Sequence, residues 1–433
     1  MTAEPFKLPA LAELQRQTFA YFLHETNPRL GLVADKTEQA GPASIAAVGL
    51  ALAGYPVGVE RGFISRHEAV SRTLAAMRFF HTAPQGTQPD ATGYKGFYYH
   101  FLDMHTGKRS GGCELSTIDT ALLLAGMLAA AAYFDHEDAA EAEIRQSADE
   151  LYRRADWDWA RNGGATVSHG WSPESGFLPD RWEGYCEALV LYVLGLGSPT
   201  HPLPAESYEG WSSTYQWKNV LGYEYLYAGP LFVHQLSHLW IDLRGIQDKF
   251  MRSKGIDYFE NSRRATYAQR QYAIENPREF IDYSDISWGI TASEGPGPAT
   301  LTIGGKRRHF FGYQSREIPD GPDDGTLAPW AVVASLPFAP EIVLPALQHF
   351  EDLNLREPHR YGFKATFNRT FPEKDRDRPF WVSPYHLGLN LGPMLLMIEN
   401  AQSGLLWRLM RSCPCIIHGL SRAGFTGGWL DGK

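Results

Sequence analysis

The segment DRWEGYCEALVLYVLGLGSPTHP, residues 180–202, begins as a polar, aromatic loop, becomes apolar and ends in a Gly/Ser/Pro cluster. The apolar run predicts a helix over 181–194, because the Gly and Pro residues beyond it cannot continue one. Glu183 and Glu187 are four residues apart, so on a helix they share one face and repel each other by roughly a few tenths of a kcal/mol. A purely structural helix gains nothing from that pair. The segment therefore predicts a helix that carries a catalytic carboxylate into a cleft.

Helical periodicity dominates the rest of the chain. Predicted helices cover 11–24, 44–52, 65–81, 116–134, 137–154, 181–194, 226–242, 256–274, 327–336, 340–354, 392–400 and 403–410. About twelve helices fit a closed ring of inner and outer helices, so we expect an all-α chain that folds as a single (α/α)6 barrel over residues 1–433. A helical solenoid would need a repeat of about 30 to 50 residues, and none is found. Residues 299–313 can form a short β-ribbon at the rim, with its turn at Gly304-Gly305.

Composition argues against several classes of protein. The chain has 40 basic and 49 acidic residues, a net charge of −9 and no long basic run, so nucleic acid is not an expected partner. No apolar run reaches membrane-spanning length, and residues 1–7 lack the pattern of a secretory signal. We therefore expect a cytoplasmic protein with no membrane partner, or a periplasmic one if the N-terminus is truncated. The sequence leaves the oligomeric state open.

Nucleotide and metal cofactors are not expected either. The chain lacks the glycine motifs of dinucleotide-binding and phosphate-binding loops, and it lacks the GxSxG nucleophile elbow. Cys413 and Cys415 are too close in sequence for a zinc ribbon. His234, His238 and Asp242 recur every four residues, as metal ligands on a helix can, but the glutamate of the zinc-protease pattern is missing. We interpret these three as hydrogen-bonding or substrate-contacting groups and expect no metal and no cofactor.

Long loops rich in aromatic residues separate the predicted helices. The chain holds 12 Trp, 21 Tyr and 23 Phe, and many of them stand beside Gly, Asp or Asn. They suit stacking on sugar rings or filling a large core, and composition alone does not decide between these readings. One set of loops surrounds one mouth of a helical ring. The candidate rim loops are 84–116, 157–182, 197–225, 283–325 and 356–392.

Three carboxylates besides Glu187 are candidates for catalysis. Ser116 and Asp119 have the spacing of a capping box, which explains Asp119 as a helix cap as readily as a catalytic group. Glu114 precedes this cap and is free to face a cleft. Glu294 lies in a Gly/Pro loop, where it is either solvated or bound to sugar hydroxyls.

Polar and aromatic side chains of the loops are candidates for substrate binding. Trp171 is a stacking platform in a turn-rich loop, and His201 is either a hydrogen-bonding group at the cleft or a loop anchor. The full set of candidates is Glu183, Tyr185, Trp171, Trp182, His201, Trp288, Asp285 and Asn390. Carboxylates among stacking surfaces are what glycoside hydrolysis requires: one carboxyl protonates the leaving oxygen and one carboxylate activates water.

At these residues the sequence resembles the glucoamylase-like family that contains the bacterial endo-β-1,2-glucanases of glycoside hydrolase family 144. It is similar also to a domain of cyclic β-1,2-glucan synthases. The motifs that carry the resemblance are STIDTALL (116–123), WEGYCEAL (182–189), GSPTHP (197–202), WID (240–242), DYFENS (257–262), WGITAS (288–293) and IEN (398–400). They run in order along nearly the whole chain. The resemblance implies a single (α/α)6 barrel that hydrolyses β-glucan, first of all β-1,2-glucan or its oligosaccharides, with inversion.

The resemblance also suggests roles for single residues. Glu187 occupies the position of the acid in the family's GYxEA motif. The family often has Asp where this chain has Glu294 and Asn390, and an Asn cannot act as a base. We therefore expect the base, or the group that positions water, among Glu114, Asp119 and Glu294. Two alternatives stay open: transglycosylation or glucosyl transfer from a β-1,2-glucan, and a non-catalytic glucan-binding protein, which Asn390 favours.

Overall fold

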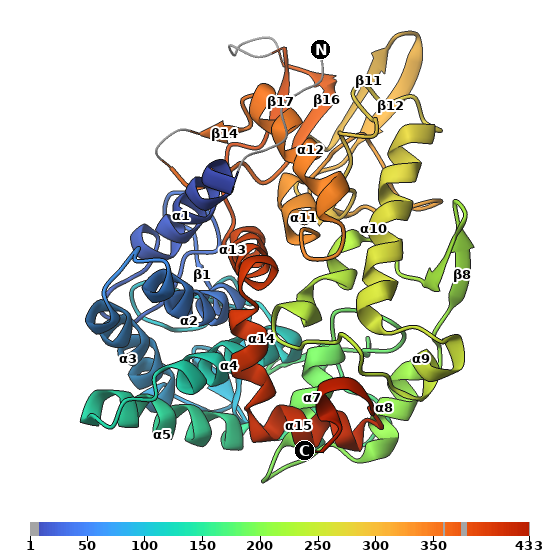
Figure 1. The fold of residues 1–433 in the computed structure, drawn as a ribbon. Helices are drawn as coiled ribbons and strands as arrows, with labels where there is room; N and C mark the ends of the chain where they lie inside the picture. The colour runs from blue at the N-terminus through green and yellow to red at the C-terminus, as the bar shows by residue number, and fades with distance from the viewer. Residues whose placement is uncertain (1–7, 358–359, 374–378, 433) are drawn as a thin grey trace.

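The computed structural model describes residues 8–357, 360–373 and 379–432, which form a helix-rich fold (Figure 1). The α-helices are α1 (Leu8–His24), α2 (Ile45–Glu60), α3 (Arg66–Thr82), α4 (Thr117–Tyr133), α5 (Ala139–Arg154), α6 (Trp157–Ala160), α7 (Leu189–Gly197), α8 (Ala205–Ser212), α9 (Lys249–Lys254), α10 (Tyr258–Glu275), α11 (Pro329–Ala334), α12 (Pro340–Asp352), α13 (Gly388–Gln402), α14 (Leu405–Arg411) and α15 (Pro414–Arg422). Three 3-10 helices are η1 (Leu231–His234), η2 (Leu236–Leu239) and η3 (Gly428–Leu430).

Most of the predicted helices are confirmed, with ends that differ by a few residues. Two of them begin at the serine cap that the sequence indicates: the Ser65 hydroxyl accepts a hydrogen bond from the Glu68 N–H, and the Ser116 hydroxyl accepts one from the Asp119 N–H. The sequence patterns miss α6, α8, α9 and α15. These helices have four, eight, six and nine residues, which is too short for a clear periodic stripe.

Two predicted helices are wrong in an informative way. Residues 181–188 are irregular and α7 begins only at Leu189, because Gly184 takes a left-handed φ of +75° that no regular helix contains. Glu183 and Glu187 therefore do not share a helical face. The predicted helix over 226–242 is replaced by the end of a strand and the two short 3-10 helices η1 and η2, which are separated at Gln235.

The helices nearest the centre contact one another in a closed sequence. Helix α2 packs on α4, α4 on α7, α11 on α13, and α13 returns to α2. The link from α7 to α11 runs through η2 and the residue before it. The Ser237 hydroxyl accepts the Val190 N–H at the start of α7, and the Gln235 side chain donates to the Ala331 carbonyl of α11. Figure 1 shows α3 and α5 at one edge of the molecule and α10 towards the opposite edge.

Small residues permit the closest of these contacts. A Cβ atom added to Gly126 of α4 would lie 2.0 Å from the carbonyl oxygen of Gly49 in α2. Because this distance is shorter than any real contact, no larger residue fits where α2 and α4 cross. The glycine in each helix thus lets the two backbones touch, which holds the start of α4 close to the N-terminal segments.

Short strands join the loops at the helix ends, so the expectation of an all-α chain is incomplete. The largest sheet is antiparallel with the order β2-β3-β5-β6-β7. Its strands are β2 (Gly93–Tyr94), β3 (Phe97–Tyr99), β5 (Leu115–Ser116), β6 (Gly170–Ser172) and β7 (Gly176–Phe177). Strands of two or three residues carry no period-two pattern, which is why the sequence does not indicate them.

The remaining strands form two-stranded antiparallel ribbons. They are β1 (Ala43–Ser44) with β4 (Phe101–Leu102), β8 (Trp217–Val220) with β9 (Tyr223–Leu226), β10 (Ala292–Ser293) with β13 (Gln314–Ser315), β11 (Ala299–Ile303) with β12 (Lys306–Phe310), β14 (Arg356–Glu357) with β15 (Gly362–Phe363), and β16 (Phe367–Pro372) with β17 (Phe380–Val382). The predicted ribbon is confirmed as β11–β12, with Gly304 and Gly305 at positive φ in its turn. Among the described helices, none is long and apolar enough to cross a membrane.

Candidate active site

A cavity of about 530 Å³ gathers carboxylates from distant parts of the chain. Five of them line it: Asp35, Glu114, Asp119, Glu187 and Glu294. Asp119 lies in the first turn of α4, Glu114 directly precedes β5, Glu187 stands two residues before α7, and Glu294 directly follows β10. The four carboxylates expected to serve catalysis are therefore brought together, and Asp35 joins them without having been expected.

Glu187 is held at the start of α7 but its carboxylate is left without a side-chain partner. The Ser237 hydroxyl donates to the Glu187 carbonyl, which fixes the backbone. Its carboxylate bonds only to the backbone N–H of the same residue, within the part of the chain that the structure describes. Burial raises the pKa of Glu187 to about 7, and the negative charge of Asp119 adds to the rise. A carboxyl of this kind carries a proton near neutral pH and can donate it.

His100 stands between two of the other carboxylates. Its Nδ1 lies 2.8 Å from Glu114 Oε1, and its Nε2 lies 3.6 Å from Asp119 Oδ2. Burial opposes a charge on the ring, but Asp119 and Glu114 together raise the pKa of His100 to about 9. Burial also opposes a charge on Glu114, yet the His100 hydrogen bond holds the pKa of Glu114 below its ordinary value. The three groups form a cluster in which the imidazolium compensates both carboxylates.

Asp119 has a second partner that the sequence indicates. The Ser116 hydroxyl donates to Asp119 Oδ2 over 2.5 Å, and the same hydroxyl accepts the Asp119 N–H. The expected capping box is therefore present, although Asp119 also lines the cavity. The cap is confirmed, and a catalytic role for Asp119 stays a prediction.

Asp35 reaches the cavity from the loop between α1 and α2. Its backbone carbonyl accepts the Gly388 N–H over 2.8 Å, which places this loop beside the start of α13, where Asn390 also lines the cavity. Burial raises the pKa of Asp35 to about 6, against the opposing positive charges of His100 and Lys36. Among the described residues the carboxylate has no hydrogen-bond or ion-pair partner. Only the tertiary contacts reveal it, because no sequence motif surrounds it.

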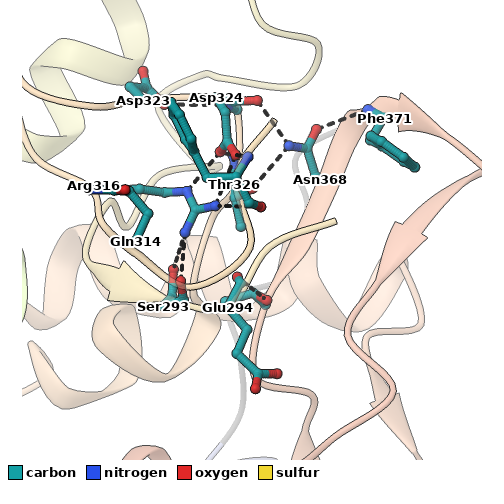
Figure 2. A network of polar contacts seen from close by, with 12 residues as sticks. Ser293, Glu294, Gln314, Arg316, Asp323, Asp324, Thr326, Asn368 and Phe371 are labelled. Atoms are coloured by element: carbon teal, nitrogen blue, oxygen red, sulfur yellow. Dashed lines mark hydrogen bonds and ion pairs between the residues drawn. The ribbon is translucent and has the colours of Figure 1, made fainter. Parts of the chain in front are cut away.

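Glu294, by contrast, is paired with a cation. Lys36 Nζ lies 3.3 Å from Glu294 Oε1 and 3.2 Å from Glu38 Oε2, and it stands 4.8 Å from the ring centre of Tyr385. The Thr366 hydroxyl donates to the Glu294 carbonyl. Figure 2 shows the Glu294 side chain pointing away from the polar network that holds its backbone. Glu294 is therefore part of an ion pair, whereas Glu187 and Asp35 are in none among the described residues.

Two aromatic side chains contribute to the cavity in different ways. Trp182 is 9% exposed, stacks on His169 with ring centres 3.8 Å apart, and donates its indole N–H to the Thr117 hydroxyl. It forms a fixed part of the wall. Tyr313, which the sequence does not single out, also lines the cavity but is 72% exposed.

Six of the predicted substrate-binding residues do not line this cavity. Tyr185 lies close to Cys186 and Glu187 in sequence but packs against the rings of His234 and Tyr258. Glu183 is exposed and accepts a hydrogen bond from the Thr166 hydroxyl.

The other four are spread over separate parts of the fold. Trp171 packs on Tyr94 within the five-stranded sheet, and Trp288 is fully buried in the core. Asp285 pairs with Arg270 on the surface, and His201 lies 3.9 Å from Asp156. Of the four predicted aromatic residues, Trp182 lines the cavity, and Tyr185, Trp171 and Trp288 pack elsewhere.

The structure also shows what the histidine spacing does. His234 contacts the Ala228 carbonyl and His238 contacts the Ser262 hydroxyl, and burial lowers the pKa of His234 to about 4 and that of His238 to about 3. Asp242 accepts hydrogen bonds from Arg244. The interpretation of these three as hydrogen-bonding groups is confirmed. The ligand atoms of His100, Glu114 and Asp119 all lie within 4.8 Å of one another and could hold a metal ion, but each already pairs within its own cluster.

Known proteins resemble this chain over most of its length. Residues 179–414 match the model of the Glycoamylase family. A solved structure from Bacteroides uniformis is 30% identical, covers 99% of this chain and all of its own, and superposes with a TM-score of 0.86. The endo-β-1,2-glucanase of Chitinophaga pinensis, solved with sophorotriose and glucose, is 27% identical over 98% of this chain and 100% of that one, with a TM-score of 0.83.

A curated relative extends beyond the matching region. The exo β-1,2-glucooligosaccharide sophorohydrolase (non-reducing end) of Parabacteroides distasonis is 28% identical over 94% of this chain. The chain spans 57% of the length of that relative.

Proposed function

Because the chain belongs to the Glycoamylase family, we propose that it is a glycoside hydrolase that cleaves β-1,2-glucan or its oligosaccharides. Two relatives bear names for action on β-1,2-linked glucan or its oligosaccharides, one exo-acting and one endo-acting. The closed sequence of inner helices supports the further proposal that the fold is an (α/α)6 barrel. The carboxylate cavity then lies at one mouth of that barrel.

One observation carries the assignment of roles. Of the five carboxylates around the cavity, three are compensated: Glu114 and Asp119 by His100, and Glu294 by Lys36. Glu187 and Asp35 have no such partner among the described residues. A half-buried carboxylate without a side-chain partner costs stability, so two of them in one cavity indicate a function.

Glu187 is the general acid in this proposal and Asp35 the general base. As the bond between C1 and the glycosidic oxygen breaks, the Glu187 proton passes to that oxygen. A water molecule attacks C1 from the opposite face of the sugar and transfers its proton to Asp35. The new C1–O bond then has the opposite configuration to the old one, so the reaction inverts the anomeric centre.

Asp119 is the competing base among the expected residues. Its Oδ2 atom already accepts the Ser116 hydroxyl and faces the His100 imidazolium. Both contacts occupy this oxygen, so it is not free to take a proton from an attacking water. We therefore assign Asp119 to holding His100 and shaping the field at Glu187, and Asp35 to activating water.

The test is incubation of the purified protein with α- and β-linked glucans, followed by product sizing and NMR of the released anomers. Cleavage of β-1,2-glucan with initial release of α-configured reducing ends is expected. Sophorose as the sole early product indicates exo action, and a mixture of lengths indicates endo action. Unchanged β-1,2-glucan contradicts the proposal. Products with new linkages or longer chains would show that the reaction is transglycosylation and not hydrolysis.

A further inference from the structure

Tyr313 projects into the cavity without packing against it. It follows Gly312 in the loop between β12 and β13, lines the same cavity as Glu187, and keeps 72% of its surface exposed. Among the described residues its ring has no aromatic neighbour and its hydroxyl no hydrogen-bond partner. Exposing so much of an aromatic ring forgoes the burial that most Tyr side chains obtain on folding.

The ring lines the same cavity as the groups proposed to act on the glycosidic bond. Its surroundings raise the pKa of the Tyr313 hydroxyl, first through burial among the cavity walls and then through the charges of Glu187, Asp119 and Asp35. All three carboxylates line the same cavity as the ring, and solvent still covers most of the surface of the ring. A sugar bound beside Glu187 would displace that solvent.

The backbone that carries Tyr313 is held rigidly. The Phe311 N–H donates to Asp324 Oδ2 over 2.8 Å, and the Gly297 N–H donates to the Phe311 carbonyl over 2.8 Å. On the other side of Tyr313, strand β13 pairs with β10, so that Gln314 stands opposite Ser293. Both flanks of the exposed side chain are thus fixed by hydrogen bonds.

Arg316 joins these flanks to the strand that leads to Glu294 (Figure 2). Its guanidinium forms two bonds of 2.7 and 2.9 Å with the Asp324 carboxylate, and both side chains are fully buried. It also donates to the carbonyls of Ser293, Phe311 and Gly312. One buried cation therefore fixes the loop before Tyr313 and the residue before Glu294 relative to each other.

We propose that Tyr313 is a substrate-binding residue, a rigidly mounted platform on which a glucosyl ring of the glucan chain stacks next to the scissile bond. The inference rests on the proposed function for the identity of the sugar. A pyranose ring presents C–H groups on its face, which match an exposed aromatic surface, and its hydroxyls can bond the phenol. Because Arg316 and Asp324 hold the mount, little ordering entropy is lost when the sugar binds.

The test compares three single variants with the wild type. Tyr313→Ala removes the ring, Tyr313→Phe keeps the ring without the hydroxyl, and Ser315→Ala is a control for an exposed side chain two residues further on, in strand β13. Steady-state kinetics on β-1,2-glucooligosaccharides are combined with calorimetric binding of β-1,2-, β-1,3-, β-1,4- and α-1,4-glucooligosaccharides. Thermal melting checks that each variant is folded, which we expect because these side chains are exposed.

Tyr313→Ala should raise KM and Kd about tenfold with kcat changed less than about threefold, while Tyr313→Phe and Ser315→Ala stay within about twofold of the wild type. Wild-type KM and Kd in Tyr313→Ala overturn the inference but leave hydrolysis intact. Equal losses in Ser315→Ala overturn it too, since they indicate a disturbed loop. If Tyr313→Ala binds a glucan of another linkage more weakly and the wild type does not cleave β-1,2-glucan, Tyr313 is a platform but β-1,2-glucan is not the substrate. Absence of binding by every glucan overturns both.

Discussion

The cavity and the Arg316 network both shield charged groups from solvent, but those groups are paired in the network and partly unpaired in the cavity. In the network, the Arg316 guanidinium and the Asp324 carboxylate have side-chain exposures of 0%, and each has several hydrogen-bond partners. In the cavity, Glu187 and Asp35 have no side-chain hydrogen bond or ion pair among the described residues. The two regions adjoin. The network holds the backbone at Ser293, and the next residue, Glu294, lines the cavity.

The difference separates structural charge from functional charge. Full hydrogen bonding of a buried ion pair offsets its desolvation and fixes one geometry, which is what a mounting for a loop requires. An unpaired carboxylate instead has a pKa close to the pH at which the enzyme works. Breaking the first kind of group should cost stability, and removing the second kind should cost activity while stability is kept or increased.

The largest expected effect comes from Glu187→Gln. Without a proton donor for the leaving oxygen, kcat should fall by about 10³- to 10⁴-fold, or roughly 4 to 5.5 kcal/mol of transition-state stabilisation. Glu183→Gln is the matched control, since Glu183 stands on the same loop but points outside the cavity lining. Initial rates on β-1,2-glucan should show near wild-type turnover for the control. Full turnover in Glu187→Gln would refute the acid assignment.

Arg316→Met should produce the largest loss of stability. It leaves the Asp324 carboxylate buried without its cation, for which about 3 to 5 kcal/mol is expected. Lys108→Met is a control that breaks an ion pair with Asp90 on the surface, where the two side chains are 58% and 65% exposed, and it should leave stability nearly unchanged. Urea or thermal unfolding measures both. Equal small losses in the two variants would mean that the buried network does not hold the loop.

Asp35→Asn should reduce kcat by about 10²- to 10³-fold, because an amide cannot accept the proton of the attacking water. Glu38→Gln provides a control three residues further along the same loop, on an exposed side chain that pairs with Lys36 and Tyr385. Asp119→Asn measured beside them decides between the candidate bases. A nearly inactive Asp119→Asn together with a fully active Asp35→Asn would move the role of base to Asp119.

Local sequence signals predict much of the fold but only part of the cavity. Serine caps, apolar stripes and the Gly304-Gly305 turn act within a few residues, and the structure agrees with them. The polar loops before apolar helices also identified Glu187 and Asp119, which do line the cavity. In each case the residue and the element that positions it are neighbours in sequence.

The remaining features depend on contacts between segments far apart in the chain. The left-handed φ of Gly184 shifts the start of α7, and nothing in the GYxEA pattern distinguishes this glycine from one inside a helix. Asp35 reaches the cavity through a backbone contact to Gly388, more than three hundred residues away. Tyr313 is exposed and Trp288 is buried, although both lie in loops rich in aromatic residues, so their exposure is decided by tertiary contacts. Sequence periodicity reflects local structure and therefore does not indicate contacts between distant segments.

The smallest expected effect is a gain of stability in Glu187→Gln, the opposite of the loss expected for Arg316→Met. The pKa of Glu187 rises from 4.5 to about 7 on folding, so folding must suppress its ionisation. The wild type therefore loses stability as pH rises from about 4.5 to 7, because the unfolded chain ionises first. Glu187→Gln does not have this cost and should be more stable than the wild type by roughly 1 to 3 kcal/mol at pH 8 and equally stable near pH 4. Thermal melts across this range measure the difference, and a pH-independent gap would show that Glu187 has a hidden partner and belongs with the paired charges.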